Sequence, residues 1–237
     1  MIILFVVIPA KNEALTIGAV VTSVRQSVPC TVIVVDDGSS DSTVAKAEEA
    51  GGLVLPMVQS IGAWLATQAG LRYAARLGAQ QVITMDADGQ HRAEDIPALL
   101  EAQEENEVDV IIGACVSRGS LSRRIAWSLF KRLTGVNIAD LTSGFRLYNK
   151  NALLVLTSRQ ASLLEFQDMG VLLMLRSAGL KMHEVTVSMC RRTNGISRVF
   201  SSWGKVTYYM MVTLFLCLVK ALPERSTRYI RRLKQGS

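Results

Sequence analysis

The feature that most constrains this chain is the regular alternation of apolar runs and amphipathic segments over its first 112 residues. Short runs rich in valine and isoleucine recur at residues 2–8, 31–35, 53–57, 81–85 and 108–112. Segments with apolar residues at helical spacing lie between them, at residues 14–27, 42–50, 61–77 and 93–105. Continuous apolar strands that alternate with helices are typical of parallel sheets buried on both faces. The sequence therefore predicts an α/β fold, with a mostly parallel sheet flanked by helices.

The second half of the chain has a different pattern, and no linker separates it from the first half. We expect a basic amphipathic helix, an extended segment, an apolar helix, a strand and a second apolar helix, at residues 122–133, 142–148, 167–178, 181–189 and 203–222. Residues 1–112 and 113–200 are predicted to form one domain, in which the second part packs around the open edge of the sheet. Residues 201–237 are expected to form a C-terminal amphipathic helix and a basic tail.

Charge is distributed unevenly along the 237 residues. Residues 1–110 carry 6 Lys and Arg against 15 Asp and Glu, whereas residues 111–237 carry 20 against 5. This asymmetry indicates one half that handles cations and another that meets an anionic partner, such as a phosphate, a lipid headgroup or nucleic acid. Basic helices with solvated faces are the alternative explanation.

Cysteine and histidine usage excludes two classes of site. The four cysteines are scattered without C-x-x-C spacing, which predicts buried thiols in a reducing compartment rather than a disulfide framework or a zinc site. The two histidines, His91 and His183, lie too far apart in sequence to indicate a histidine-rich metal site. The apolar start is interpreted as the first strand rather than a signal segment. No apolar run reaches the ~18 to 20 residues that a membrane-spanning helix needs.

Two carboxylates one residue apart, Asp86 and Asp88, directly follow the predicted strand at 81–85. Alone, such a pair is most simply a turn or a solvated acidic pair. The first and second predicted strands, however, also end in carboxylate-bearing loops, at residues 9–13 and 36–43. Parallel strands bring these loops to one edge of the sheet, where clustered carboxylates are costly without a cation or ligand. Paired carboxylates suit Mg²⁺ or Mn²⁺ shared with a substrate phosphate. A carboxylate that ends a buried strand, such as Asp36, suits a base or ribose, whereas Asp41 is expected to cap the next helix.

Several segments together resemble glycosyltransferase family 2, and within it the dolichol- or polyprenyl-phosphate mannose synthase branch with its bacterial relatives. They are Pro9-Ala-Lys-Asn-Glu13, Val-Val-Asp36-Asp37-Gly-Ser-x-Asp41-x-Thr43 and Asp86-Ala-Asp88-Gly-Gln90-His91. Segments that are also similar to that branch are Asp140-x-Thr142-Ser-Gly144-Phe145-Arg146, Glu184-Val185 and Arg192-x-x-Gly195-x-Ser197-Arg198. The resemblance runs from about residue 4 to residue 212.

This resemblance implies a GT-A (Rossmann-like) fold and an inverting, metal-dependent transfer from a nucleotide-diphosphate sugar, either GDP- or UDP-linked. The residues that it implies for nucleotide-sugar binding are Pro9, Ala10, Lys11, Glu13, Asp36, Asp37, Gly62, Asp86 and Ala87. The metal, Mg²⁺ or Mn²⁺, is assigned to Asp86, Asp88 and Gln90, while His91 is expected to orient their loop. Direct displacement is implied, without a covalent sugar–enzyme intermediate.

The basic half is assigned to the acceptor. Arginines bind phosphate through bidentate hydrogen bonds, and those predicted to do so are Arg118, Arg124, Arg192 and Arg198. The predicted catalytic residues are Asp88, Asp168 and Arg146, with Asp168 as a base or as an orienting group. The alternatives are a solvated helix face for Arg124 and a helix cap for Asp168.

The leading prediction is transfer of a hexose to a polyprenyl phosphate carrier, which needs little help from a base because a phosphate oxygen is already anionic. The alternative acceptor is a saccharide hydroxyl, lipid-linked or free, in cell-surface polysaccharide or glycan assembly. A nucleotidyltransferase is disfavoured, because the first loop is not the glycine-rich phosphate loop that such enzymes need. No nucleic-acid partner is expected, because no nucleic-acid-binding motif is present.

Aromatic, apolar and basic residues are combined in the predicted helices at 122–133 and 203–222. This combination suits helices that lie on an anionic membrane surface. We therefore expect a cytoplasmic protein attached peripherally to the inner face of the membrane. The alternative is that residues 208–219 cover the sheet or form a homodimer contact.

Overall fold

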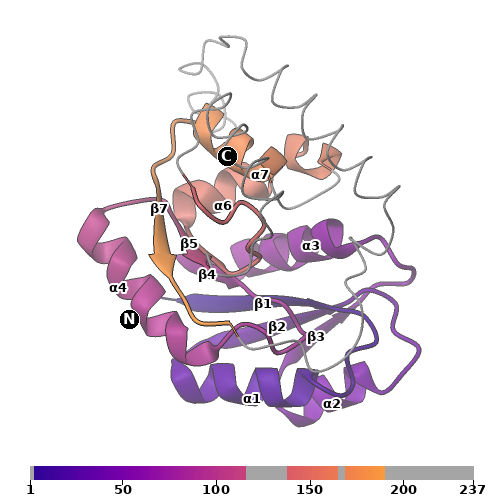
Figure 1. Cartoon of the computed structure of the whole chain (residues 1–237). Helices are drawn as coiled ribbons and strands as arrows, with labels where there is room; N and C mark the ends of the chain where they lie inside the picture. The colour runs from indigo at the N-terminus through magenta and orange to yellow at the C-terminus, as the bar shows by residue number, and fades with distance from the viewer. Residues whose placement is uncertain (1–2, 116–137, 165–168, 190–237) are drawn as a thin grey trace, which may run out of the picture.

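The structure, a computed structural model, describes residues 3–115, 138–164 and 169–189, and within them a seven-stranded sheet with helices on both faces (Figure 1). The strands are β1 (Leu4–Ala10), β2 (Thr31–Asp36), β3 (Leu53–Pro56), β4 (Gln81–Thr84), β5 (Val110–Ala114), β6 (Arg146–Asn149) and β7 (Met182–Thr186). The α-helices are α1 (Ile17–Ser27), α2 (Thr43–Glu49), α3 (Ala63–Arg76), α4 (Ile96–Asn106), α6 (Lys150–Leu156) and α7 (Met169–Ser177). Short 3₁₀ turns are η1 (Ala93–Asp95) and η3 (Gln160–Leu163).

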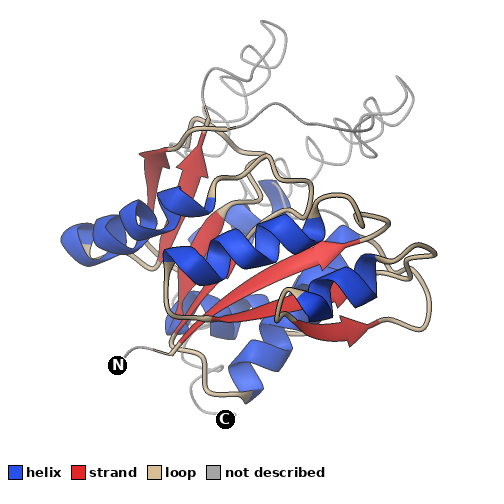
Figure 2. Ribbon diagram, turned by 90° about the horizontal axis from the view of Figure 1, so that it is seen from below, coloured by secondary structure: helices blue, strands red, loops and turns tan. Residues whose placement is uncertain are grey.

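Strand residues alternate between two cores, one on each face of the sheet. In β1, Val6 and Ile8 join the core beneath α1, α2 and α4, whereas Phe5 and Val7 join the core beneath α3, α6 and α7. Figures 1 and 2 show these helices on opposite sides of the sheet. Because both faces are covered, the strands can be apolar at every position, and this explains the continuous apolar runs of the sequence.

The sheet order is β3-β2-β1-β4-β6-β5-β7, and all the pairings are parallel except those of β6. The predicted mostly parallel sheet is therefore confirmed. The second half is expected to pack around the open edge of the sheet, and β7 lies at that edge, whereas β6 lies inside the sheet. Strand β6 lies antiparallel between β4 and β5, where its backbone pairs on both sides. The two predicted halves share one sheet.

Helix α3 packs unusually close to β1 and β2 at Gly70. A Cβ atom placed on Gly70 would lie 2.4 Å from Cγ1 of Val7 and 2.9 Å from Cγ2 of Val35. Only a residue without a side chain fits at this distance. Gly70 therefore lets α3 lie against β1 and β2, the strands that lead into the carboxylate-bearing loops at residues 9–13 and 36–43.

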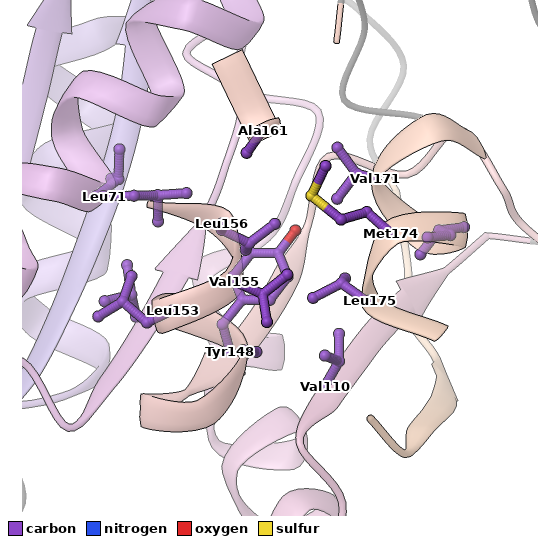
Figure 3. Close-up of a cluster of buried hydrophobic side chains, with 14 of the residues drawn as sticks. Leu71, Val110, Tyr148, Leu153, Val155, Leu156, Ala161, Val171, Met174 and Leu175 are labelled. Carbon is purple, nitrogen blue, oxygen red and sulfur yellow. The ribbon is translucent and has the colours of Figure 1, made fainter. Parts of the chain in front are cut away.

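Helices α6 and α7 complete the core on the α3 side. Figure 3 shows Leu153 and Leu156 of α6 with Leu175 of α7, next to Leu71 of α3 and Tyr148 of β6. Helix α6 was not predicted, because its seven residues follow β6 without an intervening loop. Asn149 caps the start of α6, because its side chain accepts a hydrogen bond from the backbone N–H of Ala152.

The end of α6 and the turn after it are held by three side chains of α3 spaced four residues apart. Trp64 Nε1 donates to the carbonyl of Ala161, and Gln68 Nε2 donates to that of Leu156. Arg72 donates to the carbonyls of residues 157 and 158 and to the hydroxyl of residue 162. These donors satisfy carbonyls that a helix end leaves without intrahelical partners.

Two groups of sequence predictions fall wholly or partly outside the described residues. The helices predicted at 122–133 and 203–222 lie there, together with Cys190 and Cys217. The two cysteines in the described part, Cys30 and Cys115, are half-buried. Burial raises the pKa of the Cys30 thiol to about 11 against the opposing effect of Arg25. Within the described ranges, no helix combines the length and apolar character needed to cross a membrane.

Candidate active site

The three carboxylate-bearing loops that follow β1, β2 and β4 meet at one edge of the sheet. Strands β2, β1 and β4 are parallel neighbours, so their carboxyl ends lie side by side. Ala10 pairs with Asp36, and the N–H of Asp37 donates to the carbonyl of Ala10 at 2.8 Å. The N–H of Met85 donates to the carbonyl of Val7 at 3.1 Å. Residues 9–13, 36–43 and 86–91 therefore leave the sheet next to one another.

Asp36 is the last residue of β2 and is buried, with 4% of its surface exposed. Its Oδ2 accepts a hydrogen bond from the N–H of Ser39 at 3.1 Å. Its Oδ1 is buried and accepts no hydrogen bond within the part of the chain that the structure describes. A buried carboxylate oxygen without a donor is costly, so this atom suits an N–H or O–H group of a ligand.

Asp37, the next residue, is also buried, but its carboxylate is hydrogen-bonded to other groups of the protein. Its carboxylate accepts hydrogen bonds from Ser60 Oγ at 2.7 Å and from the backbone N–H groups of Ile61, at 2.6 Å, and Gly62. It thereby fixes the loop that leads into α3 and that contains Gly62, a predicted nucleotide-sugar contact. The sequence did not reveal this division of roles between two adjacent aspartates.

The loop after β4 exposes its first carboxylate. The side chain of Asp86 is 46% exposed, and its Oδ2 lies 3.7 Å from Nδ1 of His91. Among the described residues, no donor hydrogen-bonds to this carboxylate. Asp88 is half-buried, and its Oδ1 accepts the N–H of Gln90 at 3.0 Å. Ala87 and Gln90 are buried. The loop thus presents an open carboxylate at its start and a second one that is tied to the loop itself.

His91 holds this loop from inside. Its Nδ1 accepts the backbone N–H of Asp86 at 3.1 Å, and its ring stacks on Phe145 with the centroids 5.3 Å apart. Because Nδ1 accepts a hydrogen bond, a neutral ring carries its proton on Nε2. This geometry agrees with a role in orienting the loop rather than in ligating an ion. His183 is exposed on β7.

Gly144 approaches the carboxylate of Asp86 from the turn before β6. A Cβ atom on Gly144 would lie 2.8 Å from Oδ1 of Asp86, and the carbonyl of Gly144 accepts a hydrogen bond from Thr84 Oγ1 at 2.7 Å. Glycine is therefore required for the Asp86 carboxylate to keep its place. The sequence marked Gly144 only as part of a family signature, since the contact spans residues far apart in the chain.

The turn that carries Gly144 is fixed by a carboxylate from the edge strand β7. Glu184 accepts hydrogen bonds at 2.8 Å from the backbone N–H groups of Ala139 and Asp140. Asp140 is buried, and it accepts hydrogen bonds from the N–H and hydroxyl of Thr142. Arg146, at the end of the turn, is fully buried, and its Nη2 donates to the carbonyl of Leu141 at 3.0 Å. A direct contact of Arg146 with a substrate stays a prediction.

The residues present fit a divalent cation that is shared with a ligand. Within the described ranges, no three side chains of His, Cys, Asp or Glu could together hold a metal ion. The Asp86 loop instead offers two carboxylates and the amide oxygen of Gln90, all of them hard oxygen ligands. Mg²⁺ is commonly bound by one or two carboxylates together with substrate phosphates, and the exposed carboxylate of Asp86 leaves room for that arrangement.

The remaining predicted positions are partly described. Pro9, Lys11 and Glu13 are half-buried at the end of β1, and Gly62 is exposed at the start of α3. Predicted residues outside the described ranges are Arg118, Arg124, Asp168, Arg192 and Arg198. The last described residue before Arg192 is Met189, which forms a β-bridge with His91 of the Asp86 loop.

Comparisons with known proteins identify the family. A family model described as "Glycosyl transferase family 2" matches residues 5–156, more than half of the chain. An undecaprenyl-phosphate mannosyltransferase of Micrococcus luteus is 33% identical over 163 residues, which cover 62% of this chain and 66% of that protein. A polyprenol monophosphomannose synthase of Mycolicibacterium smegmatis is 32% identical over 165 residues, which cover 62% of each protein. The match thus spans less than two thirds of either relative.

The fold agrees with this assignment. The crystal structure of glucosyl-3-phosphoglycerate synthase from Mycobacterium tuberculosis with Mn²⁺, UDP-glucose and phosphoglyceric acid aligns with a TM-score of 0.69. The alignment covers 94% of this chain and 81% of that chain, at 19% identity. At this identity the likeness shows the fold, a Rossmann-like GT-A fold. From its matched family model, the chain belongs to glycosyltransferase family 2.

Proposed function

We propose that this glycosyltransferase transfers a hexose from a nucleotide-diphosphate sugar to a polyprenyl phosphate. The observation that carries the proposal is that one edge of the sheet holds two carboxylates with different surroundings, Asp36 and Asp86. Asp36 has a buried oxygen that suits a ligand donor, and Asp86 has an exposed carboxylate that suits a cation. A nucleotide-diphosphate sugar presents both chemistries, a nucleoside with N–H and O–H donors and a diphosphate with its counter-ion.

The nucleoside is proposed to lie against β1 and β2. Asp36 would accept a hydrogen bond from the base or ribose, with Pro9, Ala10, Lys11 and Glu13 lining the same position. The uracil of UDP has an N3–H and the guanine of GDP has an N1–H, and a carboxylate can accept a hydrogen bond from either, so the proposal covers both donors. The structurally similar glucosyl-3-phosphoglycerate synthase was crystallised with UDP-glucose, which supports a nucleotide-sugar donor.

The diphosphate is proposed to lie beside the loop after β4, with Mg²⁺ or Mn²⁺ held by Asp86, Asp88 and Gln90. When bound, the cation would neutralise the charge that develops on the departing diphosphate. The protein's own contribution is to keep Asp86 in place, through His91 beneath its backbone and Gly144 beside its carboxylate. The Mn²⁺ in the structurally similar glucosyl-3-phosphoglycerate synthase supports a metal-dependent reaction.

The transfer step is proposed to be a direct displacement that inverts the anomeric carbon. An anionic oxygen of the acceptor phosphate forms a bond to that carbon as the bond to the diphosphate breaks, and the nucleoside diphosphate leaves with the electron pair. No proton has to be removed from the acceptor, because a phosphate oxygen is ionised at neutral pH. Arginines 118, 124, 192 and 198 are proposed to bind this phosphate, Arg146 to act as a catalytic residue and Asp168 to orient the acceptor.

The acceptor proposal rests on the relatives. Two of them are named for mannosyl transfer to undecaprenyl or polyprenol phosphate. The excess of basic residues after residue 110 also supports an acceptor whose phosphate is attached to a lipid. We accordingly propose peripheral attachment to the cytoplasmic face of the membrane, which salt-sensitive binding to anionic liposomes would test.

The proposal is tested by a donor panel. GDP- and UDP-linked hexoses are incubated with the protein and Mn²⁺, with and without a short polyprenyl phosphate, and release of nucleoside diphosphate is measured. Release that requires the lipid phosphate supports the proposal. Release that requires a saccharide instead, and that Asp168→Asn abolishes, would identify a hydroxyl acceptor and overturn the polyprenyl phosphate assignment. No release with any donor or acceptor would overturn the proposed function as a whole.

A further inference from the structure

The loop after β1 is fastened to the loop after β2 through three consecutive backbone N–H groups. The N–H of Asn12 donates to Ser39 Oγ at 2.9 Å, and the N–H of Glu13 donates to Thr43 Oγ1 at 2.8 Å. The N–H of Ala14 donates to Asp41 Oδ2 at 3.2 Å. Every acceptor is a side chain of the segment that follows Asp37, so the first loop takes its shape from the second.

The fastening is reciprocal at Asn12. Its Oδ1 accepts the backbone N–H of Ser40 at 2.8 Å, and its backbone has a φ of +52°. A residue other than glycine in this left-handed region is held there by its surroundings, at a cost of roughly 1 kcal/mol or more. The surroundings here are the hydrogen bonds to Ser39 and Ser40.

Thr43 and Asp41 form the far end of the same fastening. Thr43 is fully buried, and its hydroxyl accepts the N–H of Glu13 while donating to the carboxylate of Asp41. Burial opposes ionisation of Asp41, but the hydrogen bonds from Thr43 and Ala14 outweigh it and lower the pKa of its carboxyl below 3.8. Asp41 is expected to cap the next helix, and its Oδ1 does accept the N–H of Thr43, the first residue of α2, at 3.0 Å. Its Oδ2 also joins the two loops through Ala14.

Ser39 connects this fastening to the carboxylate at the root of the site. Its backbone N–H donates to Asp36 Oδ2, and its hydroxyl accepts the N–H of Asn12. One residue therefore orients both Asp36, whose other oxygen is buried without a described donor, and the loop that holds Lys11 and Glu13.

We propose that Ser39, Asp41 and Thr43 are positioning residues for the nucleotide, which hold Lys11 and Glu13 at a fixed place relative to Asp36. This inference rests on the proposed nucleotide-sugar donor. None of the three needs to contact the nucleotide. The competing explanation is that these hydrogen bonds stabilise the fold without affecting binding, and the two explanations differ in what they predict for affinity.

The test compares Thr43→Val with Thr43→Ser in the full chain. Valine keeps the shape of threonine but cannot accept the N–H of Glu13, whereas serine keeps the hydroxyl. Binding of UDP and of GDP with Mn²⁺ is measured by titration calorimetry, and the donor KM and kcat are measured at a temperature where all variants are folded. For the nucleotide that binds the wild type, Thr43→Val should weaken affinity and raise the donor KM about tenfold or more, with a much smaller change in kcat.

Two further variants separate positioning from stability. Ser39→Ala, at a more exposed site than Thr43, should also weaken binding and keeps the test open if Thr43→Val does not fold. Ser42→Ala is the matched control on the same loop, because the Ser42 side chain makes no capping hydrogen bond. Thr43→Ser should restore most of the affinity.

The outcomes distinguish the inference from the proposed function. If the wild type binds neither UDP nor GDP, the nucleotide-sugar proposal fails. If the wild type binds and both Thr43→Val and Ser39→Ala bind with wild-type affinity, with only their melting temperatures lowered, the positioning role is wrong and the fastening serves stability alone.

Discussion

The carboxylates that follow β2 and those that follow β4 lie at the same edge of the sheet but have different surroundings. Asp37 and Asp41 accept hydrogen bonds from protein donors on other loops, three from residues 60–62 in the first case and one from Ala14 in the second. Asp86 accepts none from the described residues and is 46% exposed. The same residue type therefore shapes loops beside β2 and faces outward beside β4.

This difference separates the carboxylates that support the fold from those that are available to a ligand. A carboxylate saturated by backbone N–H groups is part of the scaffold, and its removal acts through the position of other residues. A carboxylate that the protein leaves open is available to a cation or a ligand. The two classes should therefore respond differently to substitution, and four predictions test that expectation.

The largest effect is expected for Asp86→Asn, which removes the charge of the open carboxylate and keeps its size. We expect kcat/KM to fall on the order of 10³-fold, because charge stabilisation at the leaving group is lost. The melting temperature should stay near that of the wild type, since no described donor is left without its acceptor. Activity that persists after this substitution, or in the presence of EDTA, would contradict the metal assignment.

A smaller effect is expected for Gly144→Ala. Its new Cβ would lie 2.8 Å from Oδ1 of Asp86 and would push the carboxylate aside, so activity should fall about 10²-fold. Steady-state kinetics over a Mn²⁺ titration should show a raised metal requirement.

Gly70→Ala is the matched control for this variant, because its Cβ would lie 2.4 Å from Cγ1 of Val7 inside the core. It should lower the free energy of unfolding by roughly 1–3 kcal/mol, as overpacking does, without changing the metal requirement of the folded enzyme. Equal metal requirements for both glycine variants would show that Gly144 has no special relation to Asp86.

Asp37→Asn should act on the donor rather than on the metal. The amide can accept fewer of the hydrogen bonds from Ser60, Ile61 and Gly62, so the loop before α3 should loosen. We expect a donor KM raised about tenfold and a loss of ~1–3 kcal/mol in the free energy of unfolding. A donor KM unchanged from the wild type, measured beside a normal metal requirement, would mean that this loop does not contact the donor.

The smallest effect is the pH dependence contributed by Asp41. Hydrogen bonds lower the pKa of its folded-state carboxyl below 3.8, so its ionised form stabilises the folded protein. That contribution is present above the ordinary pKa and is lost as the pH falls through the lower folded value. Because the side chain is exposed, the contribution is small.

Urea unfolding of the wild type and of Asp41→Asn, measured between about pH 6 and pH 3, checks this sign. The difference in unfolding free energy between the two proteins should shrink as the pH falls. A difference that stays constant over this range would show that the charge of Asp41 does not contribute.

The sequence predicted the parts of the fold that depend on local patterns. Strands β1, β2 and β4 follow from continuous apolar runs, and the meeting of their ends follows from parallel pairing. Strand β6 was predicted only as an extended segment at residues 142–148, and its antiparallel place between β4 and β5 has no local signal in a four-residue strand with a buried arginine. Helix α6 was not predicted, because it follows β6 without a turn signal. Helix α1 begins at Ile17 rather than at Ala14, because residues 13–16 form a separate turn.

The candidate site was predicted by residue type but not by role. The sequence placed Asp36, Asp37, Asp86 and Asp88 at one edge, and the structure brings them there. It could not show that Asp37 and Asp41 accept hydrogen bonds from backbone groups 24 to 27 residues away on other loops. It also could not show that Gly144 must lack a side chain. These roles depend on contacts between segments far apart in the chain, for which local spacing carries no signal.

We propose that the open carboxylate of Asp86 holds a cation, whereas the carboxylate of Asp37, which accepts hydrogen bonds from residues 60–62, does not. Electron paramagnetic resonance of Mn²⁺, titrated into the protein with saturating UDP or GDP, tests this directly. We expect bound Mn²⁺ in the wild type and in Asp37→Asn, and a loss of Mn²⁺ binding in Asp86→Asn. Undiminished Mn²⁺ binding in Asp86→Asn, or a loss in Asp37→Asn alone, would contradict the proposal.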